Sequence, residues 1–386
     1  MPHFLAQYEE LGKLPFTDEV YKVLYEAVSI RNPNESLICM DYEEDEFFIR
    51  KIKKPQAILF KAEKISKPSP IGILKGALRV LAKKSTLISH NLNNDSIKQT
   101  LKSNFFLKPQ EVFRLDFSKL CIEIGFGSGR HLLKLAQENP HQTYIGMEIH
   151  TPSIQQVLRQ IDLLGLKNLY IVCMDARVLL EILPSNSCEI IYVHFPVPWN
   201  KKPHRRVISH KFLAQVDRVL KKDGFLELRT DDEQYFRDSL EIAMKANNTR
   251  AEIGKNLSSE VISKYEARWQ RAQKDIFDLR IFSLKQSEDK KIEYDFSFSS
   301  FSFNALEKIH QVGKIIKTDF FLHICEVFRT DDGKFILILS FGDFSWPVNK
   351  IVIFEKKRAY YFGGHPLSTE ANINSHLELL NLLMEK

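Results

Sequence analysis

The stretch Glu123-Ile-Gly-Phe-Gly-Ser-Gly129 decides how this chain of 386 residues folds. It ends an apolar run that begins at Leu120 and opens a helical pattern over residues 130–138. Glycines let the backbone turn sharply and come close to a ligand. Their spacing is G-x-G-x-G rather than the G-x-G-x-x-G of dinucleotide-binding proteins, and the acidic Glu123 precedes them. A carboxylate at this turn disfavours a pyrophosphate but is compatible with a ligand that carries cationic groups, such as S-adenosylmethionine.

Alternating strand-like and helical patterns surround this glycine loop, from about residue 115 to residue 284. Such alternation predicts a parallel, doubly wound sheet with helices on both faces, which is an α/β, Rossmann-like fold. Sheets of this kind bind ligands at the carboxyl ends of their strands. The expected strands cover residues 120–125, 143–149, 169–174, 189–194 and 224–229.

Two further acidic residues, Glu148 and Asp175, fall where the second and third strands should end. Glu148 follows the glycine loop by about 20 residues, where an acid suits hydrogen bonds to a ribose diol. Asp175 and Ala176 lie where an adenine amino group would meet a side chain or the backbone. Alternatively, each acid caps a helix or lies in a solvated loop, and the glycines form a turn that binds nothing. Taken together, they predict an S-adenosylmethionine site formed by Glu123, Gly125, Gly127, Glu148 and Asp175.

The flanking segments are predicted to form modules outside this α/β core. Residues 1–100 have the pattern of a small α+β module. Phe and Ser alternate over residues 296–303, which predicts either an edge strand or a low-complexity linker. Several short strand patterns and a final helix over residues 370–384 complete a mainly β module. The predicted domains are therefore 1–100, 101–284 and 285–386.

The composition favours a cytoplasmic protein without a membrane segment. Hydrophobic residues make up 44% of the chain and charged residues 27%. No run approaches the ~18 apolar residues of a membrane span, and the N-terminus lacks the pattern of a secretion signal. The five cysteines are scattered without a C-x-x-C pair, which argues against a disulfide framework and against a metal site. The net charge of +6 is weak evidence for a nucleic-acid partner, and the oligomeric state stays open.

Several later motifs give the chain a resemblance to the tRNA (guanine-N7-)-methyltransferase family. The resemblance covers residues 100–284, and the flanking modules look like the extensions of a longer bacterial form. The Pro-x-Pro-Trp-x-Lys segment is far more specific than the glycine loop, which many methyltransferases share. The matching segments are Glu123–Gly129, Ile145–His150, Asp175-Ala176, Phe195–Lys201, His204–Arg206, Arg229–Asp232 and Ser263–Arg268.

The resemblance implies a class I methyltransferase that transfers a methyl group from S-adenosylmethionine to N7 of a guanosine in tRNA. Glu123, Glu148 and Asp175 would then bind the donor. Asp231 would bind the guanosine and stabilise the positive charge that methylation creates on the purine. The residues expected on the substrate side are Lys201, Asp231, Ser263, Lys264, Tyr265 and Glu266. The residues expected to contact RNA phosphates are Lys201, Lys202, Arg205 and Arg206.

Each of these assignments has a structural alternative. Lys201 could belong to a solvated turn, Asp231 could cap the helix expected from Glu233, and residues 264–268 could be the polar face of a helix. Two residues depart from the family pattern. Val197 stands where the family usually has an aspartate between the two prolines, and Ser128 in the glycine loop is a smaller departure. Two other functions therefore stay open. The chain could methylate another RNA site or a small molecule, or it could bind tRNA without catalysis.

Overall fold

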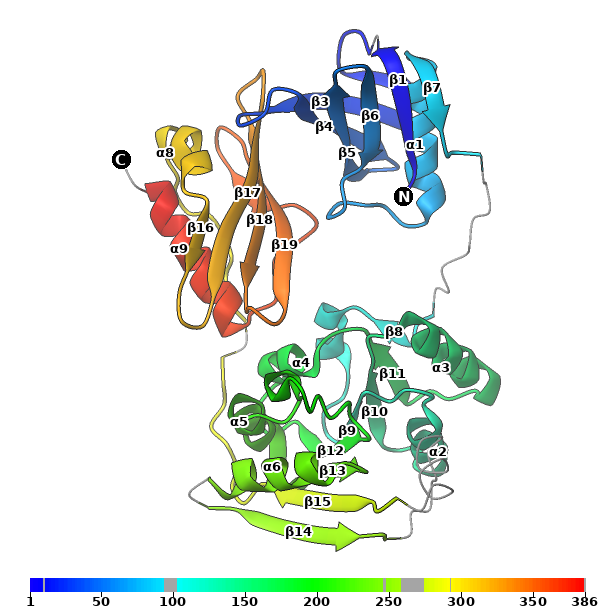
Figure 1. Cartoon of the computed structure of the whole chain (residues 1–386), viewed down its shortest axis with the longest axis vertical. Helices are drawn as coiled ribbons and strands as arrows, with labels where there is room; N and C mark the ends of the chain where they lie inside the picture. The colour runs from blue at the N-terminus through cyan, green and yellow to red at the C-terminus, as the bar shows by residue number, and fades with distance from the viewer. Residues whose placement is uncertain (10, 94–102, 246–247, 258–273, 292, 385–386) are drawn as a thin grey trace. The chain divides into compact units, whose positions relative to one another are not determined.

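The computed structural model describes the chain except for residues 10, 94–102, 246–247, 258–273, 292 and 385–386 (Figure 1). The chain divides into two compact units. One consists of residues 1–100 together with residues 294–386, and the other consists of residues 101–293. Among the described residues, no helix is long and apolar enough to cross a membrane.

Residues 101–293 fold around a sheet that has eight strands within the described part of the chain, in the order β14-β15-β13-β12-β9-β10-β11-β8. The pairs from β13 to β8 are parallel, whereas β15 is antiparallel to both β13 and β14. The doubly wound parallel core predicted from the sequence is confirmed. The strands are β8 (Phe106–Leu107), β9 (Leu120–Ile124), β10 (Thr143–Met147), β11 (Leu169–Val172), β12 (Cys188–His194), β13 (Leu220–Thr230), β14 (Arg250–Lys255) and β15 (Phe277–Phe282).

The helices of this unit bury apolar residues at helical spacing against the sheet. In α3, Ile154, Val157, Leu158 and Ile161 lie on one buried stripe, and Gly165 ends the helix with a φ of 65°. Helix α2 packs against α3, and α5 packs against α4 and α6. The helices within the described residues of this unit are α2 (Arg130–Glu138), α3 (Thr151–Leu164), α4 (Ala176–Ile182), α5 (His210–Val219) and α6 (Glu233–Met244), with short 3-10 turns at Pro109–Arg114 and Pro203–Arg205.

The strand order reverses next to β9, which lies between β10 and β12. From β9 the chain moves outward through β10 and β11, then returns to the other side for β12 and β13. The loops that leave β9 and β12 therefore diverge, and a crevice for ligands forms at their carboxyl ends. Glu123 on β9 pairs in register with Gly146 on β10 and with Tyr192 on β12, so this carboxylate lies at the centre of the reversal.

The other unit contains a sheet of twelve strands within the described residues, in which the N-terminal and C-terminal segments pair with each other. Strand β3 pairs antiparallel with β17 through Phe328 opposite Ser29 and Arg329 opposite Val28. Arg50 also forms an ion pair with Glu326 at 2.6 Å. The strands are β1 (His3–Glu9), β2 (Phe16–Asp18), β3 (Tyr21–Ser29), β4 (Glu35–Tyr42), β5 (Asp45–Lys54), β6 (Ala57–Ala62), β7 (Ser85–His90), β16 (Lys314–Ile316), β17 (Phe321–Thr330), β18 (Phe335–Gly342), β19 (Pro347–Phe354) and β20 (Ala359–Tyr361).

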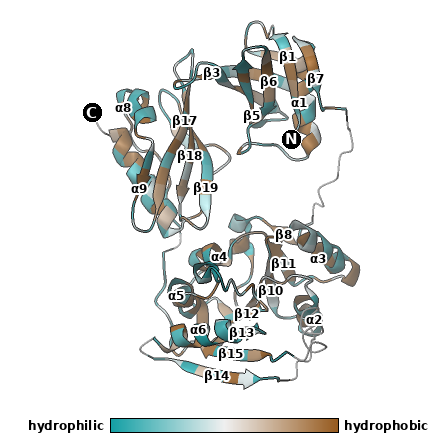
Figure 2. Cartoon of the chain, viewed as in Figure 1, coloured by the Kyte–Doolittle hydropathy of each residue, from teal (hydrophilic) through white to brown (hydrophobic). Residues whose placement is uncertain are grey.

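In the part of this unit that the structure describes, three helices pack on the sheet, namely α1 (Ile71–Lys83), α8 (Phe303–Lys308) and α9 (Glu370–Met384), and a 3-10 turn follows α8 at Ile309–Gln311. Strand β18 is hydrophobic along most of its length, as expected for a strand covered on both faces (Figure 2). Of the two alternatives predicted for residues 296–303, the edge strand is wrong. This segment pairs with no strand, and its alternation instead buries Phe296 and Phe298 in the core while Ser297 faces outward.

Candidate active site

The glycine loop joins β9 to α2 in a conformation that needs its glycines. Gly125 and Gly129 have φ values of 72° and 68°, which side chains rarely tolerate. A Cβ on Gly129 would lie 2.4 Å from Val157 of α3, so glycine also permits the close approach of this helix. A Cβ on Gly125 would meet no atom within 4 Å. The backbone at Gly125 is therefore open to a ligand.

Glu148 fastens the end of β10 to this loop. One carboxylate oxygen accepts a hydrogen bond from the backbone N–H of Gly127 at 3.1 Å. The other accepts from the N–H groups of Ile149 and His150 at 2.8 and 3.0 Å. A carboxylate offers about four acceptor positions, so the oxygen that binds Gly127 can still accept a bond from a ligand hydroxyl.

Asp175 follows β11 and caps helix α4, which is the structural alternative that the sequence left open. Its carboxylate accepts a bond from the backbone N–H of Arg177 at 2.8 Å. The Arg177 guanidinium donates to the same carboxylate at 2.9 and 2.7 Å. The side chain is thus fixed at the end of β11 by two kinds of bond. A role in donor binding stays a prediction.

The loop after β12 turns through two unusual backbone conformations. Phe195 and Trp199 have φ values of 50° and 47°, a region that bulky residues seldom occupy. Trp199 is 39% exposed, and the Arg205 guanidinium lies 5.1 Å from its ring centroid. Val197, in the position of the family's aspartate, is 62% exposed. This loop therefore presents an aromatic ring, a cation and an apolar side chain to solvent.

The basic segment that follows β12 is divided between surface and interior. Lys201, Lys202 and Arg205 are exposed, as phosphate contacts require. The prediction that Arg206 contacts phosphates is wrong, because this side chain is only 5% exposed. Its guanidinium donates to the Pro198 carbonyl at 2.6 Å and to the Asn200 side chain at 3.0 Å, and it pairs with Asp238. Arg206 therefore holds the loop in place.

Two adjacent aspartates at the end of β13 have different partners. Asp232 caps helix α6 by accepting a bond from the Tyr235 N–H at 2.7 Å, and it also accepts from Asn200 at 2.8 Å. Asp231 is not the cap and forms an ion pair with Lys274 at 3.0 Å. Its proposed contact with the guanosine is untested. The other residues predicted for the substrate side, Ser263, Lys264, Tyr265 and Glu266, lie outside the described residues.

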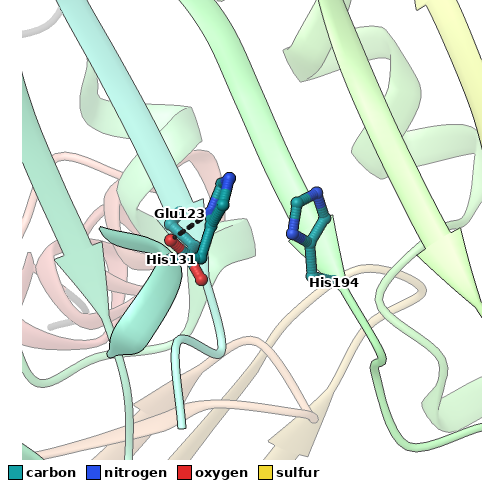
Figure 3. Close-up of side chains that lie close together, drawn as sticks. All are labelled: Glu123, His131 and His194. Carbon is teal, nitrogen blue, oxygen red and sulfur yellow. Dashed lines mark hydrogen bonds and ion pairs between the residues drawn. The ribbon is translucent and has the colours of Figure 1, made fainter. Parts of the chain in front are cut away.

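Sequence reasoning missed a polar row beneath the crevice. Glu123 is 3% exposed, and one of its oxygens lies 2.9 Å from Nδ1 of His131 on α2. The His131 ring is in turn 4.5 Å from the His194 ring, centroid to centroid (Figure 3). Nε2 of His194 lies 3.0 Å from Glu227 on β13. The spacing of Tyr192 and His194 in β12 signals that they share a face, but nothing in the sequence indicates that His131 meets them.

At one end of this row, Glu227 lies beside His194 and the Arg280 guanidinium. Burial would raise the pKa of the Glu227 carboxyl, but hydrogen bonds and charges from His194 and Arg280 outweigh burial and lower this pKa to about 2. Arg280 of β15 lies 2.7 Å from Glu227. Burial raises the pKa of Tyr192, whose ring packs edge-on against His131. The row therefore carries a fixed negative charge at Glu227 and a neutral phenol at Tyr192.

Comparison with known proteins gives matches over the whole chain. A family model described as "Putative methyltransferase" matches residues 118–279. A tRNA (guanine-N(7)-)-methyltransferase of Helicobacter hepaticus is 47% identical over 100% of both chains. Proteins of the same name in Helicobacter pylori strain 26695 and Campylobacter jejuni strain 81-176 are 43% and 36% identical, and the matches cover at least 98% of each chain.

A solved structure of an antibiotic-related methyltransferase is also similar to part of the chain. It is 22% identical with a TM-score of 0.34, and the match covers 45% of this chain and 94% of that one. A likeness at this level adds nothing to the argument about function. The full-length identities decide the assignment, and the chain belongs to the tRNA (guanine-N(7)-)-methyltransferase family.

Proposed function

We propose that this chain transfers a methyl group from S-adenosylmethionine to N7 of a guanosine in tRNA, and that it does so in the cytoplasm. The observation that carries this proposal is the full-length identity of 47% with a tRNA (guanine-N(7)-)-methyltransferase. The carboxyl edge of the sheet supports the proposal with residues suited to both substrates. Ligands of doubly wound sheets bind at this edge.

The residues at the ends of β9 and β10 fit the methyl donor. The backbone at Gly125 faces open space, so a ligand can approach it closely. Glu148 is held at the loop by three backbone N–H groups and still has an acceptor position for a ribose hydroxyl. Because these bonds exist before the ligand arrives, little reorganisation opposes binding. When bound, the donor supplies a methyl group that is activated by its sulfonium charge.

Methylation of N7 does not require the protein to act as a general acid or a general base. The N7 atom has an in-plane lone pair and no proton to lose before attack, so no general base is required. The protein's contribution is to hold N7 in line with the methyl group at contact distance. The purine becomes cationic as it is methylated, and Asp231 is the carboxylate that we assign to this charge. Lys274, which pairs with Asp231, must then share or leave this carboxylate.

The exposed cations after β12 are suited to RNA. N7 lies on the edge of guanine that faces the major groove. In an RNA helix this groove is deep and narrow. The target guanosine is therefore expected in a loop or an accessible tertiary region of tRNA. Lys201, Lys202 and Arg205 would contact phosphates around it, and such binding weakens steeply as salt rises. The exposed ring of Trp199 would lie beside the same cations.

The proposal is tested by labelled methyl transfer from S-adenosylmethionine to unmodified tRNA, followed by nucleoside analysis. The expected product is 7-methylguanosine. A different methylated nucleoside, or a labelled small molecule, would replace this function with methylation of another acceptor. Donor binding without any transfer would point to an enzyme disabled at Val197, and tRNA binding without donor binding would point to a non-catalytic tRNA-binding protein.

A further inference from the structure

Three side chains from different elements meet beneath the glycine loop. They are Glu123 of β9, His131 of α2 and His194 of β12 (Figure 3). Each offers one ligand atom, and the three atoms lie within 4.8 Å of one another. All three side chains are largely buried, with exposures of 4%, 12% and 11%. A metal ion of the zinc class binds atoms about 2.0–2.2 Å away, so small side-chain shifts would bring all three into its shell.

The neighbours of His194 leave one of its nitrogens available. Nε2 lies 3.0 Å from the Glu227 carboxylate, at hydrogen-bond distance, so this nitrogen faces Glu227. A neutral imidazole that carries its proton on Nε2 has a lone pair on Nδ1. Figure 3 shows one ring nitrogen of His194 directed toward His131 and Glu123, with the other pointing away. A carboxylate that orients a histidine from behind is the usual outer shell of a protein metal site.

The chemistry of this cluster is that of a borderline divalent cation. Two imidazoles and one carboxylate suit zinc and its neighbours, whereas magnesium and calcium prefer sites made of oxygen atoms. The Glu123 carboxylate is buried, and a cation would compensate its charge. We propose that Glu123, His131 and His194 bind one zinc-class divalent cation, with Glu227 and Arg280 as the outer shell.

Cation binding at this cluster is separate from methyl transfer but would affect it. Glu123 is also one of the residues that we assign to the donor. A cation that engages this carboxylate removes it from the donor site, so metal binding is expected to weaken donor binding. Zinc would then act as an inhibitor rather than as a participant in the reaction. Three protein ligands leave one position of a tetrahedral site for water.

Binding of Co²⁺ to the full-length, untagged protein, stripped of metal with a chelator, tests the site. Co²⁺ takes the same ligands as zinc, and its visible absorption reports the coordination directly. We expect one Co²⁺ per chain, displaced by Zn²⁺, and no such binding in His131→Asn or His194→Asn. Glu227→Gln should weaken binding by roughly 10–100-fold, as expected for an outer-shell ligand. His141→Asn, which changes an exposed histidine in the turn after α2, is the matched control.

Circular dichroism of each variant separates lost binding from lost folding. The proposal is overturned if the wild-type protein binds no Co²⁺, or if folded His131→Asn and His194→Asn proteins bind it as well as the wild type does. The cluster would then be a hydrogen-bonded network only. Methyl transfer in the presence of a chelator is measured in parallel. Transfer without Co²⁺ binding would remove the metal site and leave the proposed function intact.

Discussion

The two halves of the carboxyl edge differ in how their polar groups are held. On the donor half, Glu148 is fixed by three backbone N–H groups and Asp175 by a two-pronged guanidinium. On the acceptor half, Lys201, Lys202 and Arg205 reach into solvent. The first arrangement suits a small ligand that must be placed accurately, and the second suits a large polyanion that binds through many weak contacts. The sheet thus presents fixed carboxylates on the half that we assign to the donor and exposed cations on the half that we assign to RNA.

Arg206 is the exception on the acceptor half, and its removal should have the largest effect. Arg206→Ala leaves the loop carbonyl of Pro198 without its partner and removes the ion pair with Asp238, which keeps a hydrogen bond from Gln234. The guanidinium is buried and each hydrogen bond of a charged group contributes about 1.5–3 kcal/mol, so its loss should destabilise the protein by about 3 kcal/mol. Arg205→Ala, at the exposed neighbour, should change stability by less than about 0.5 kcal/mol. Urea unfolding followed by circular dichroism measures the stability of both variants. Equal unfolding midpoints would contradict the distinction between a buried Arg206 and an exposed Arg205.

Glu148→Gln tests the donor half. The substitution keeps the shape of the side chain but removes the charge that its three N–H partners stabilise. A hydrogen bond to a charged group contributes about 1.5–3 kcal/mol, so donor affinity should fall roughly 10–100-fold. Calorimetry with S-adenosylmethionine measures this loss, and tRNA affinity should not change. Glu138→Gln, at the end of α2, is the control, and a similar loss there would refute a specific role for Glu148.

Lys201→Ala tests the acceptor half, and it should change tRNA binding rather than donor binding. Loss of one phosphate contact should weaken tRNA binding and lower the slope of log affinity against log salt by about 1. Donor affinity should stay the same. Lys222→Ala removes an exposed lysine near the start of β13, away from the carboxyl edge, and should leave the slope unchanged. If both variants gave the same slope, the cations after β12 would have no special place in RNA binding.

Val197→Asp should have the smallest effect. The side chain is 62% exposed, so a carboxylate needs no desolvation and stability should change by less than about 0.5 kcal/mol. A carboxylate next to the crevice would add to the charge stabilisation that we assign to Asp231. We expect turnover on tRNA to rise by less than about tenfold, equivalent to 1.4 kcal/mol. An unchanged turnover and an unchanged donor affinity would show that this position does not matter here.

Strands β9 to β13 could be predicted because each contains an apolar run that is followed by a turn. Strands β14 and β15 were not predicted. Strand β14 is mostly exposed and carries polar residues such as Arg250 and Glu252 without an apolar run. Charge alone gave a wrong prediction for one residue of the basic segment. Arg205 and Arg206 are adjacent arginines that the sequence cannot distinguish, yet Arg205 is exposed and Arg206 is buried. The difference depends on Asp238, which comes from another helix.

For the candidate site, too, the sequence predicted some features and could not predict others. The sequence predicted Glu123 and Glu148 at strand ends, because the alternation of apolar runs and helical patterns indicates where each strand stops. It could not decide which of Asp231 and Asp232 caps α6, because both are suitable residues in adjacent positions. It also could not bring His131 of α2 to His194 of β12, because that contact depends on how the helix packs on the sheet.

The central claim, that this protein methylates N7 of a guanosine in tRNA, is tested most directly by a matched pair of tRNA transcripts. One contains guanosine, and the other contains 7-deazaguanosine, in which a C–H group replaces the N7 lone pair. The account predicts that both bind with similar affinity and that only the first accepts a labelled methyl group from S-adenosylmethionine. Equal methyl transfer to both transcripts would contradict it.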